Sequence, residues 1–187
     1  SNPDEFDINL LVTPGVIHSY HSSVTKHAIS KVEARADAFY VMDGSKYNET
    51  VTNAVNDING IDTNYAAVYY PWVKILDPVK NKPMWVPPSV VLPGVISFTD
   101  SVAHEWFAPA GLNRGGLGSV LEAKTRLTHT ERDDLYEGRV NPIASFPGQG
   151  VVVFGQKTLQ GKPSALDRIN VRRLLIRLRK FIASSSR

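Results

Sequence analysis

The first 76 residues alternate between short apolar runs and segments whose apolar residues recur every three or four positions. The runs at 6–12, 37–42 and 65–70 predict three buried strands, and the breakers Thr13-Pro14-Gly15 are expected to stop the first. The two segments between these runs have the spacing of amphipathic helices. Their apolar positions are Val24, Ala28, Ile29 and Val32, then Val51, Ala54, Val55 and Ile58. This order favours a mixed α/β fold with a small parallel three-stranded sheet and right-handed crossover helices.

The pattern after residue 76 is less regular. Four prolines within 77–88 predict a hairpin-like β excursion, and Trp72–Leu76 could extend the third strand past Pro71. A helix is expected over 89–103, where Pro93-Gly94 predicts a kink or a late start.

The last 70 residues predict two more β segments and two more helices. Residues 119–127 and 150–155 are expected to be β segments, and Thr130 is expected to cap a short helix with Asp133 at its capping-box position. A long C-terminal helix is predicted from about Ser164, as N-cap, to Ile182. Its apolar stripe consists of Val171, Leu174, Leu175, Leu178 and Ile182.

Composition indicates one ordinary globular domain over 1–187, with a strand-helix half at 1–76 and a mixed half at 77–187. The chain has 187 residues, of which 42% are hydrophobic, and this length can bury a stable core. The absence of cysteine excludes disulfides, thiolate metal sites and a cysteine nucleophile. No apolar run reaches the roughly 18 residues of a membrane span, and the acidic, polar start is unlike a signal peptide.

The net charge of +3 is unevenly distributed along the chain. The first seven residues hold three acids and no base, whereas the last twenty hold seven bases and no acid. Those bases are Arg168, Arg172, Arg173, Arg177, Arg179, Lys180 and Arg187. A basic end can bind nucleic acid, an anionic membrane or an acidic protein, although a solvated helix face is the simpler interpretation.

Catalytic and cofactor motifs give little support to an enzyme. The G-x-G-x-x-G, P-loop and G-x-S-x-G patterns are absent. The glycine-rich segment 111–118, with Arg114, could form an anion nest, but a tight structural loop is favoured. For the cluster of His18, His21 and His27, a structural or exposed role is favoured over a metal site. We therefore predict no catalytic residue, cofactor, metal or small-molecule substrate.

Six blocks of sequence resemble the C-terminal core of contractile-tail sheath proteins from myovirus-type bacteriophages, and they occur in the family's order. The blocks are YAAVYYPWVK at 65–74, WVPPS at 85–89 with GVISFTD at 94–100, WFAPAGLNRG at 106–115, ERDDLY at 131–136 with VNPI at 140–143, GVVVFGQKT at 150–158, and INVRRL at 169–174. The opening strand–helix part fits the same domain only by its pattern.

The resemblance implies a structural subunit of the phage virion without catalysis. Sheath subunits stack as hexameric rings around a tail tube, and the sheath contracts to drive the tube through the host envelope. The implied partners are other sheath subunits, the tail tube, the baseplate and the tail terminator, with assembly in the host cytoplasm. Arms at both ends of family members add strands to neighbouring subunits. This chain is expected to lack both arms and to be monomeric alone.

The resemblance also suggests a function for the basic end. Arg168, Arg172, Arg173, Arg177, Arg179 and Lys180 are candidate contacts to acidic faces of the next subunit or the tube. The alternative is that the arginines of the NVRRL block hold the helix to the core. Two other functions remain open from the residues alone: a nucleotide-binding enzyme domain, with ligand near Pro14, Asp43 and Pro71, and a nucleic-acid-binding module with salt-sensitive affinity.

Overall fold

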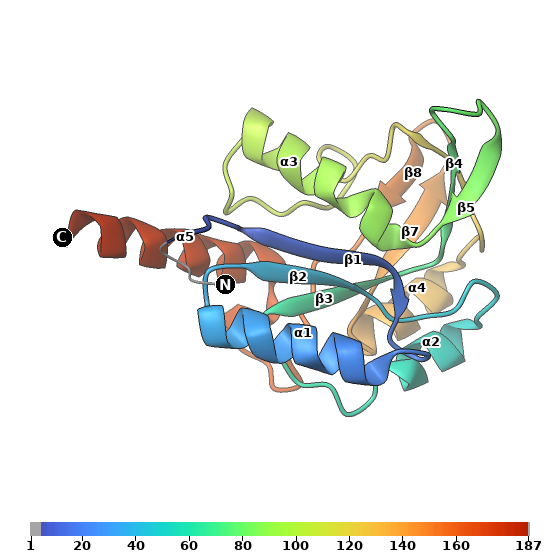
Figure 1. Ribbon diagram of the computed structural model, residues 1–187. Coiled ribbons are helices and arrows are strands. Elements are labelled where there is room, and N and C mark those ends of the chain that lie inside the picture. Colours follow the sequence, from blue (N-terminus) through green and yellow to red (C-terminus); the bar gives the residue numbers. More distant parts are fainter. Residues whose placement is uncertain (1–4, 187) are drawn as a thin grey trace.

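The main sheet has five strands in the order β1-β2-β3-β7-β8 (Figure 1). The computed structural model describes residues 5–186, so Ser1–Asp4 of the acidic start and Arg187 of the basic end lie outside it. Strands β1, β2, β3 and β7 are parallel, and β8 is antiparallel to β7. The strands are β1 (Leu10–Ile17), β2 (Phe39–Asp43), β3 (Ala66–Tyr70), β7 (Val140–Phe146) and β8 (Gly150–Val153).

The mixed α/β fold and its parallel strands are confirmed, but the sheet is larger than the three strands predicted, because β7 and β8 from the second half join it. The predicted end of the first strand was wrong. Strand β1 runs on through Thr13-Pro14-Gly15 to Ile17, with a register shift after Val12. Pro14 and Gly15 are tolerated there because β1 is an edge strand and both residues are exposed.

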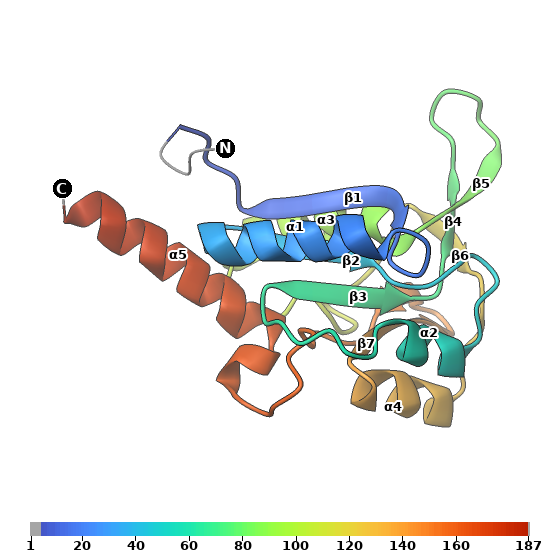
Figure 2. The same cartoon turned by 60° about the horizontal axis from the view of Figure 1, so that its bottom comes forward.

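Both faces of the sheet are covered, which explains why its strands are apolar on both sides. One face packs against the helices α1 (Ser22–Arg35), α2 (Val51–Asp57) and α4 (His129–Glu137). The other packs against α3 (Leu92–Val102), the start of α5 (Ile169–Ser185) and a second sheet (Figure 2). Alternate residues of β2 divide accordingly: Phe39 and Val41 face α3, whereas Tyr40 and Met42 face α1.

The second sheet corrects the prediction that Trp72–Leu76 continues the third strand. A cis peptide bond joins Tyr70 to Pro71, and the chain then enters a separate three-stranded sheet of order β5-β4-β6. The hairpin-like excursion is confirmed, because β4 and β5 pair antiparallel. The strands of this sheet are β4 (Val73–Leu76), β5 (Pro83–Val86) and β6 (Val120–Ala123).

Of three helix ends, one is as predicted and two differ. The late start near Pro93-Gly94 is confirmed, since a 3₁₀ turn η1 (Pro88–Val90) precedes α3, which begins at Leu92. The cap of α4 is Thr128 with Glu131, not Thr130 with Asp133; the Thr128 side chain accepts from the Glu131 amide and the Glu131 carboxylate accepts in return. Ser164 caps a short 3₁₀ turn η2 (Ala165–Asp167), and α5 begins only after it.

The carboxyl end of β2 is covered by η1 and by Trp72. The buried Asp43 accepts hydrogen bonds from Ser89 in η1, at 3.1 Å from its amide and 2.6 Å from its hydroxyl. The Trp72 indole donates to the carbonyl of Ser45, 3.0 Å away. An enzyme of the nucleotide-binding kind would hold its ligand at this end of the strands, and here η1 and the residues before β4 occupy it.

Burial raises the pKa of Asp43 from its usual value near 3.8 to about 6, although hydrogen bonds from Ser89 and Gly15 oppose this. The folded state therefore holds a proton that the unfolded state releases between about pH 4 and 6. Stability from this group is greatest below pH 4 and declines through that window. As the pH rises from 4 to 6, the free energy of unfolding of Asp43→Asn should increase relative to that of the parent chain, by up to about 3 kcal/mol. Urea unfolding of both chains at four pH values checks this; parallel stability curves would contradict it.

Candidate functional site

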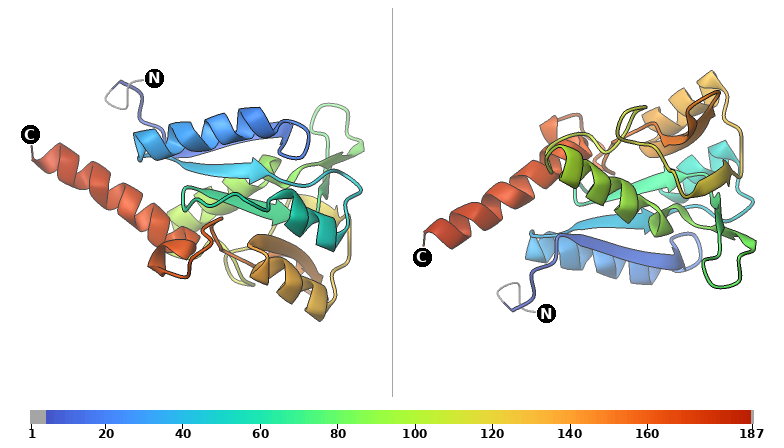
Figure 3. Two further views of the ribbon diagram at one scale, coloured as in Figure 1. Left: turned by 90° about the horizontal axis from the view of Figure 1, so that it is seen from below. Right: turned by 90° about the horizontal axis from the view of Figure 1, so that it is seen from above.

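Helix α5 begins against the sheet and projects from the body of the molecule (Figures 1 and 3). Its buried residues are Ile169, Arg172, Arg173 and Ile176, which follow the i, i+3, i+4, i+7 spacing of one helix face. The predicted stripe is displaced by two residues, about 200° around the helix, and so lies on the opposite side. Leu175 and Leu178 are about 40% exposed and Ile182 is 62% exposed. The helix thus packs through the face that carries two arginines.

Arg173 joins α5 to the end of α3. Its guanidinium forms a two-pronged ion pair with Asp100, with Nη1–Oδ1 and Nη2–Oδ2 distances of 2.8 and 2.5 Å. It also donates to the carbonyl of Glu105. Such paired, planar geometry is the strongest arrangement available to an arginine and a carboxylate.

Arg172 and Lys180 hold α5 on its other flanks. The Arg172 guanidinium lies 4.3 Å from the ring centroid of Tyr65 and donates to its hydroxyl. Burial lowers the pKa of Arg172. Lys180 donates to the Asp7 carboxylate at 2.6 Å and to the Ile8 carbonyl at 2.8 Å. The hydrogen bond from Lys180 is the main cause of the lowered pKa of Asp7.

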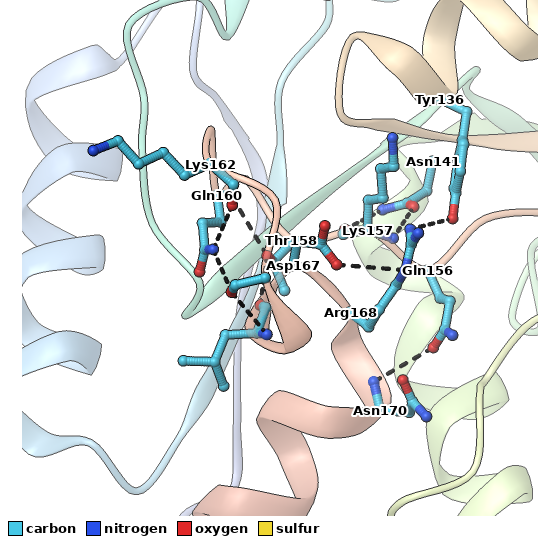
Figure 4. A network of polar contacts seen from close by, with 12 residues as sticks. Tyr136, Asn141, Gln156, Lys157, Thr158, Gln160, Lys162, Asp167, Arg168 and Asn170 are labelled. Atoms are coloured by element: carbon cyan, nitrogen blue, oxygen red, sulfur yellow. Dashed lines mark hydrogen bonds and ion pairs between the residues drawn. The ribbon is translucent and has the colours of Figure 1, made fainter.

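The base of α5 is fixed by a network of polar contacts around the segment 155–170 (Figure 4). The Asn141 side chain, fully buried in β7, accepts from the Lys157 amide at 2.6 Å. It donates to the carbonyls of Lys157 and Val68, at 2.8 and 3.1 Å. One side chain therefore joins β3, β7 and this segment, and satisfies backbone groups that would otherwise be buried without partners. A Cβ on Gly155 would lie 2.9 Å from Asn141 Oδ1, so this close approach requires glycine.

The same network closes the turn immediately before α5. Thr158 donates from its amide to the Asp167 carbonyl and from its hydroxyl to the Leu166 carbonyl. Arg168 donates to the Tyr136 hydroxyl of α4 at 2.5 Å, and Lys157 lies over the same ring. Burial, followed by the charge of Arg168, lowers the pKa of Lys157.

All six blocks of sequence singled out above meet at the base of α5. They contribute Tyr65, Asp100, the Trp106 carbonyl that accepts from Asn170, Tyr136 with Asn141, Lys157 with Thr158, and Asn170 with Arg172 and Arg173. The sequence reasoning identified the blocks but not their convergence, and it did not single out Asp100 or Asn141 as partners. The sequence pattern does not show this convergence, because the partners lie up to 107 positions apart.

The six basic candidates divide into two groups. Arg172 and Arg173 are buried in contacts within the chain, as the alternative interpretation expected, and Arg168 and Lys180 also have partners. Arg177 is 60% exposed and pairs with Glu105 at 3.4 Å, whereas Arg179 is exposed and has no polar partner within residues 5–186. Their contact with a neighbour or a tube remains a prediction.

Among the other candidates, the segment 111–118 and His18 have structural contacts, whereas His21 and His27 are exposed. The segment 111–118 covers the outer edge of β8, and Val153 accepts from Gly111 and donates to Gly115. His18 is buried with Nδ1 2.6 Å from the Thr25 hydroxyl, and burial lowers the pKa of His18.

Within residues 5–186, no group of three His, Cys, Asp or Glu side chains is placed to bind a metal. Over the same range, no helix is both long and apolar enough to cross a membrane.

This geometry defines a class of protein: a structural α/β domain whose buried polar groups serve to hold a projecting helix. Residues 4–159 match the family described as the phage tail sheath protein central domain, and the chain belongs to that family. Relatives include the tail sheath protein of Enterobacteria phage T4, 33% identical over 183 residues, and that of Vibrio phage KVP40, 37% identical over 134. These alignments cover 89% and 72% of this chain but only 28% and 20% of the relatives.

Solved structures support the same family. A sheath complex of an extracellular contractile injection system in its contracted state matches 97% of this chain and 48% of its own, with a TM-score of 0.76 and 28% identity. The helical sheath of the anti-feeding prophage, also contracted, matches 97% of this chain and 47% of its own, with a TM-score of 0.76 and 27% identity. The chain therefore has the sheath fold and spans less than half of either structure.

Proposed function

We propose that this chain is part of a contractile tail sheath subunit in a phage virion. Subunits of this kind would stack as hexameric rings around a tail tube, and contraction of the sheath would drive the tube through the host envelope. The observation that carries the proposal is the base of α5, where six family-like blocks converge on one rigid anchor. The relatives are tail sheath proteins, and a baseplate of the anti-feeding prophage has a matching chain.

An exposed strand edge supports assembly by strand addition. Within residues 5–186, β1 pairs only with β2, so the outer backbone groups of Leu10–Val12 have no strand partner. The opposite edge, at β8, is covered by the segment 111–118. An arm from a neighbouring subunit could therefore extend the sheet at β1 and link rings while other contacts change.

The basic helix supplies a second contact in this proposal. Arg177 and Arg179 are the exposed cations of α5, and they would meet an acidic face of the next subunit or of the tail tube. Arg168, Arg172, Arg173 and Lys180 would contribute by holding the helix in place. Assembly in the host cytoplasm, and contacts with a baseplate and a tail terminator, belong to the same proposal.

Negative-stain electron microscopy tests this function on the polypeptide that carries this domain together with any arms. We expect wide hollow tubes with six-fold cross-sections. If arms outside residues 1–187 connect the subunits, a polypeptide cut to these 187 residues should elute as a monomer at micromolar concentration. Globular particles from the longer polypeptide would overturn the proposal, and a stable hexamer of the short chain would overturn the role of the arms.

A further inference from the structure

Helix α5 leaves the core of the domain after Ile176, which is its last buried residue. From 177 to 186 every residue except Lys180 is exposed, and the Lys180 side chain is 22% exposed. Figure 2 shows this half of the helix extending away from the sheet. Within residues 5–186, the tip of α5, residues 177–185, is therefore attached to the domain by polar contacts and not by an apolar core.

Three ion pairs fasten α5, and their carboxylates become more exposed toward the tip. The basic residues Arg173, Arg177 and Lys180 lie four and three positions apart, so they follow one another along the helix. The carboxylate that pairs with Arg173 is 24% exposed, and the one that pairs with Arg177 is 30% exposed. The carboxylate that pairs with Lys180 is 85% exposed. Exposed pairs of this kind are weak and are screened by salt.

Lys180 attaches the tip to the segment 5–9, which leads into β1. Its ammonium group donates to the Asp7 carboxylate at 2.6 Å and to the Ile8 carbonyl at 2.8 Å. Asp7 and Lys180 lie 173 positions apart in the sequence. One side chain thus joins the approach to an edge strand of the main sheet to the far end of α5.

Few contacts hold the segment 5–9 in place. Four of its five residues are exposed. The Phe6 carbonyl accepts from Arg35 of α1 at 2.9 Å, and the Asn9 carbonyl accepts from the Phe39 amide at 3.0 Å. Regions with few buried contacts open locally at a low free energy while the rest of a protein stays folded. Two such regions, the segment and the tip, meet at one ammonium group.

We propose that Lys180 acts as a clasp, through which the segment 5–9 and the tip of α5 open and close together while the core stays folded. Coupling between two sites is reciprocal, so each region should stabilise the other. The link to assembly rests on the proposed function, which places a neighbouring arm at the edge of β1. Strand addition that draws the segment away would then release the basic tip, so the clasp connects the two subunit contacts proposed above.

Amide hydrogen exchange tests the clasp on the unassembled polypeptide that carries this domain. Asp7→Asn keeps the size of the side chain but removes its charge. It should speed exchange in the tip of α5 by about two- to five-fold, as expected for the loss of one exposed ion pair. About 1 M salt should reduce this difference. The control is Glu5→Gln, which removes the same charge from an exposed position of the same segment and should leave the tip unchanged.

Two outcomes of this measurement would overturn the clasp. One is equal exchange of the tip in the Asp7 and Glu5 variants. The other is a tip that already exchanges in the parent chain at the rate of an unstructured peptide.

Lys180→Met tests the coupling in the opposite direction. It should speed exchange of the Phe39 amide, whose acceptor is the Asn9 carbonyl, by a similar or larger factor. Arg179→Met removes the same charge from an exposed neighbouring position and should leave this amide unchanged. Faster exchange confined to the tip would contradict the coupling. Because the measurement requires no tubes, failure of the polypeptide to assemble would overturn the proposed function alone, whereas unchanged exchange at both reporters would overturn the clasp alone.

Discussion

Replacing Arg173 with alanine should lower the free energy of unfolding by about 3 kcal/mol. Its side chain is 7% exposed and is paired with Asp100, which is 24% exposed, so removal leaves a largely desolvated carboxylate without its partner. Breaking a buried ion pair on one side typically costs about 3–5 kcal/mol. The lower end applies because Asp100 retains some contact with water. Urea unfolding followed by circular dichroism measures the difference.

The matched control is Arg177→Ala, one helical turn later. Arg177 also pairs with a carboxylate, that of Glu105, but the arginine is 60% exposed and the N–O distance is 3.4 Å. A surface pair of this kind contributes less than about 1 kcal/mol. Both changes put the same residue into the same helix, so helix propensity cancels. Similar losses from the two variants would show that Arg173 does not anchor α5.

Replacing Gly115 with alanine should destabilise the chain by about 3 kcal/mol. A Cβ there would lie 2.5 Å from the Val153 carbonyl oxygen and 2.8 Å from backbone atoms of Gly111. These are backbone atoms of the loop that covers β8, so the overlap is relieved only by moving the loop and weakening its hydrogen bonds. Unfolding in urea measures the loss, and faster amide exchange at Val153 would locate it.

Gly116→Ala is the neighbouring control. A Cβ on Gly116 meets no atom within 4 Å, and its backbone is outside the left-handed region that favours glycine. The substitution should change stability by less than about 1 kcal/mol, because it only restricts the unfolded chain. Equal effects at the two glycines would contradict the close approach at Gly115.

The first half of the fold could be predicted because its apolar runs and helical spacings are local signals. Tyr69 and Tyr70 are buried in β3 as the strand pattern indicated. The membership of β7 in the main sheet could not be predicted, since its partner β3 lies about 70 residues earlier. The chain's passage into a second sheet at Pro71 also depends on tertiary context, because the apolar run continues through the boundary.

Helix α5 shows why the site was harder to predict than the fold. Hydrophobic periodicity identified its leucine stripe correctly, but an apolar stripe ordinarily faces the core. Here Tyr65 and Asp100 provide a stacked ring and a paired carboxylate, which make burial of Arg172 and Arg173 favourable. Tyr65 immediately precedes β3, and Asp100 lies in α3. The basic residues were therefore found from sequence, while the division between anchoring and exposed cations required the structure.

The length of α5, together with its rigid base, has a mechanical consequence. Its 17 residues span about 25 Å, and contacts from its base to Lys180 fix the helix to the domain, so that the two turn together. The helix therefore acts as a lever. A rotation of the whole domain by about 12° would carry the free end through about 5 Å, close to the rise of one helical turn. Small changes in subunit orientation would thus be converted into a shift between one set of side-chain contacts and the next.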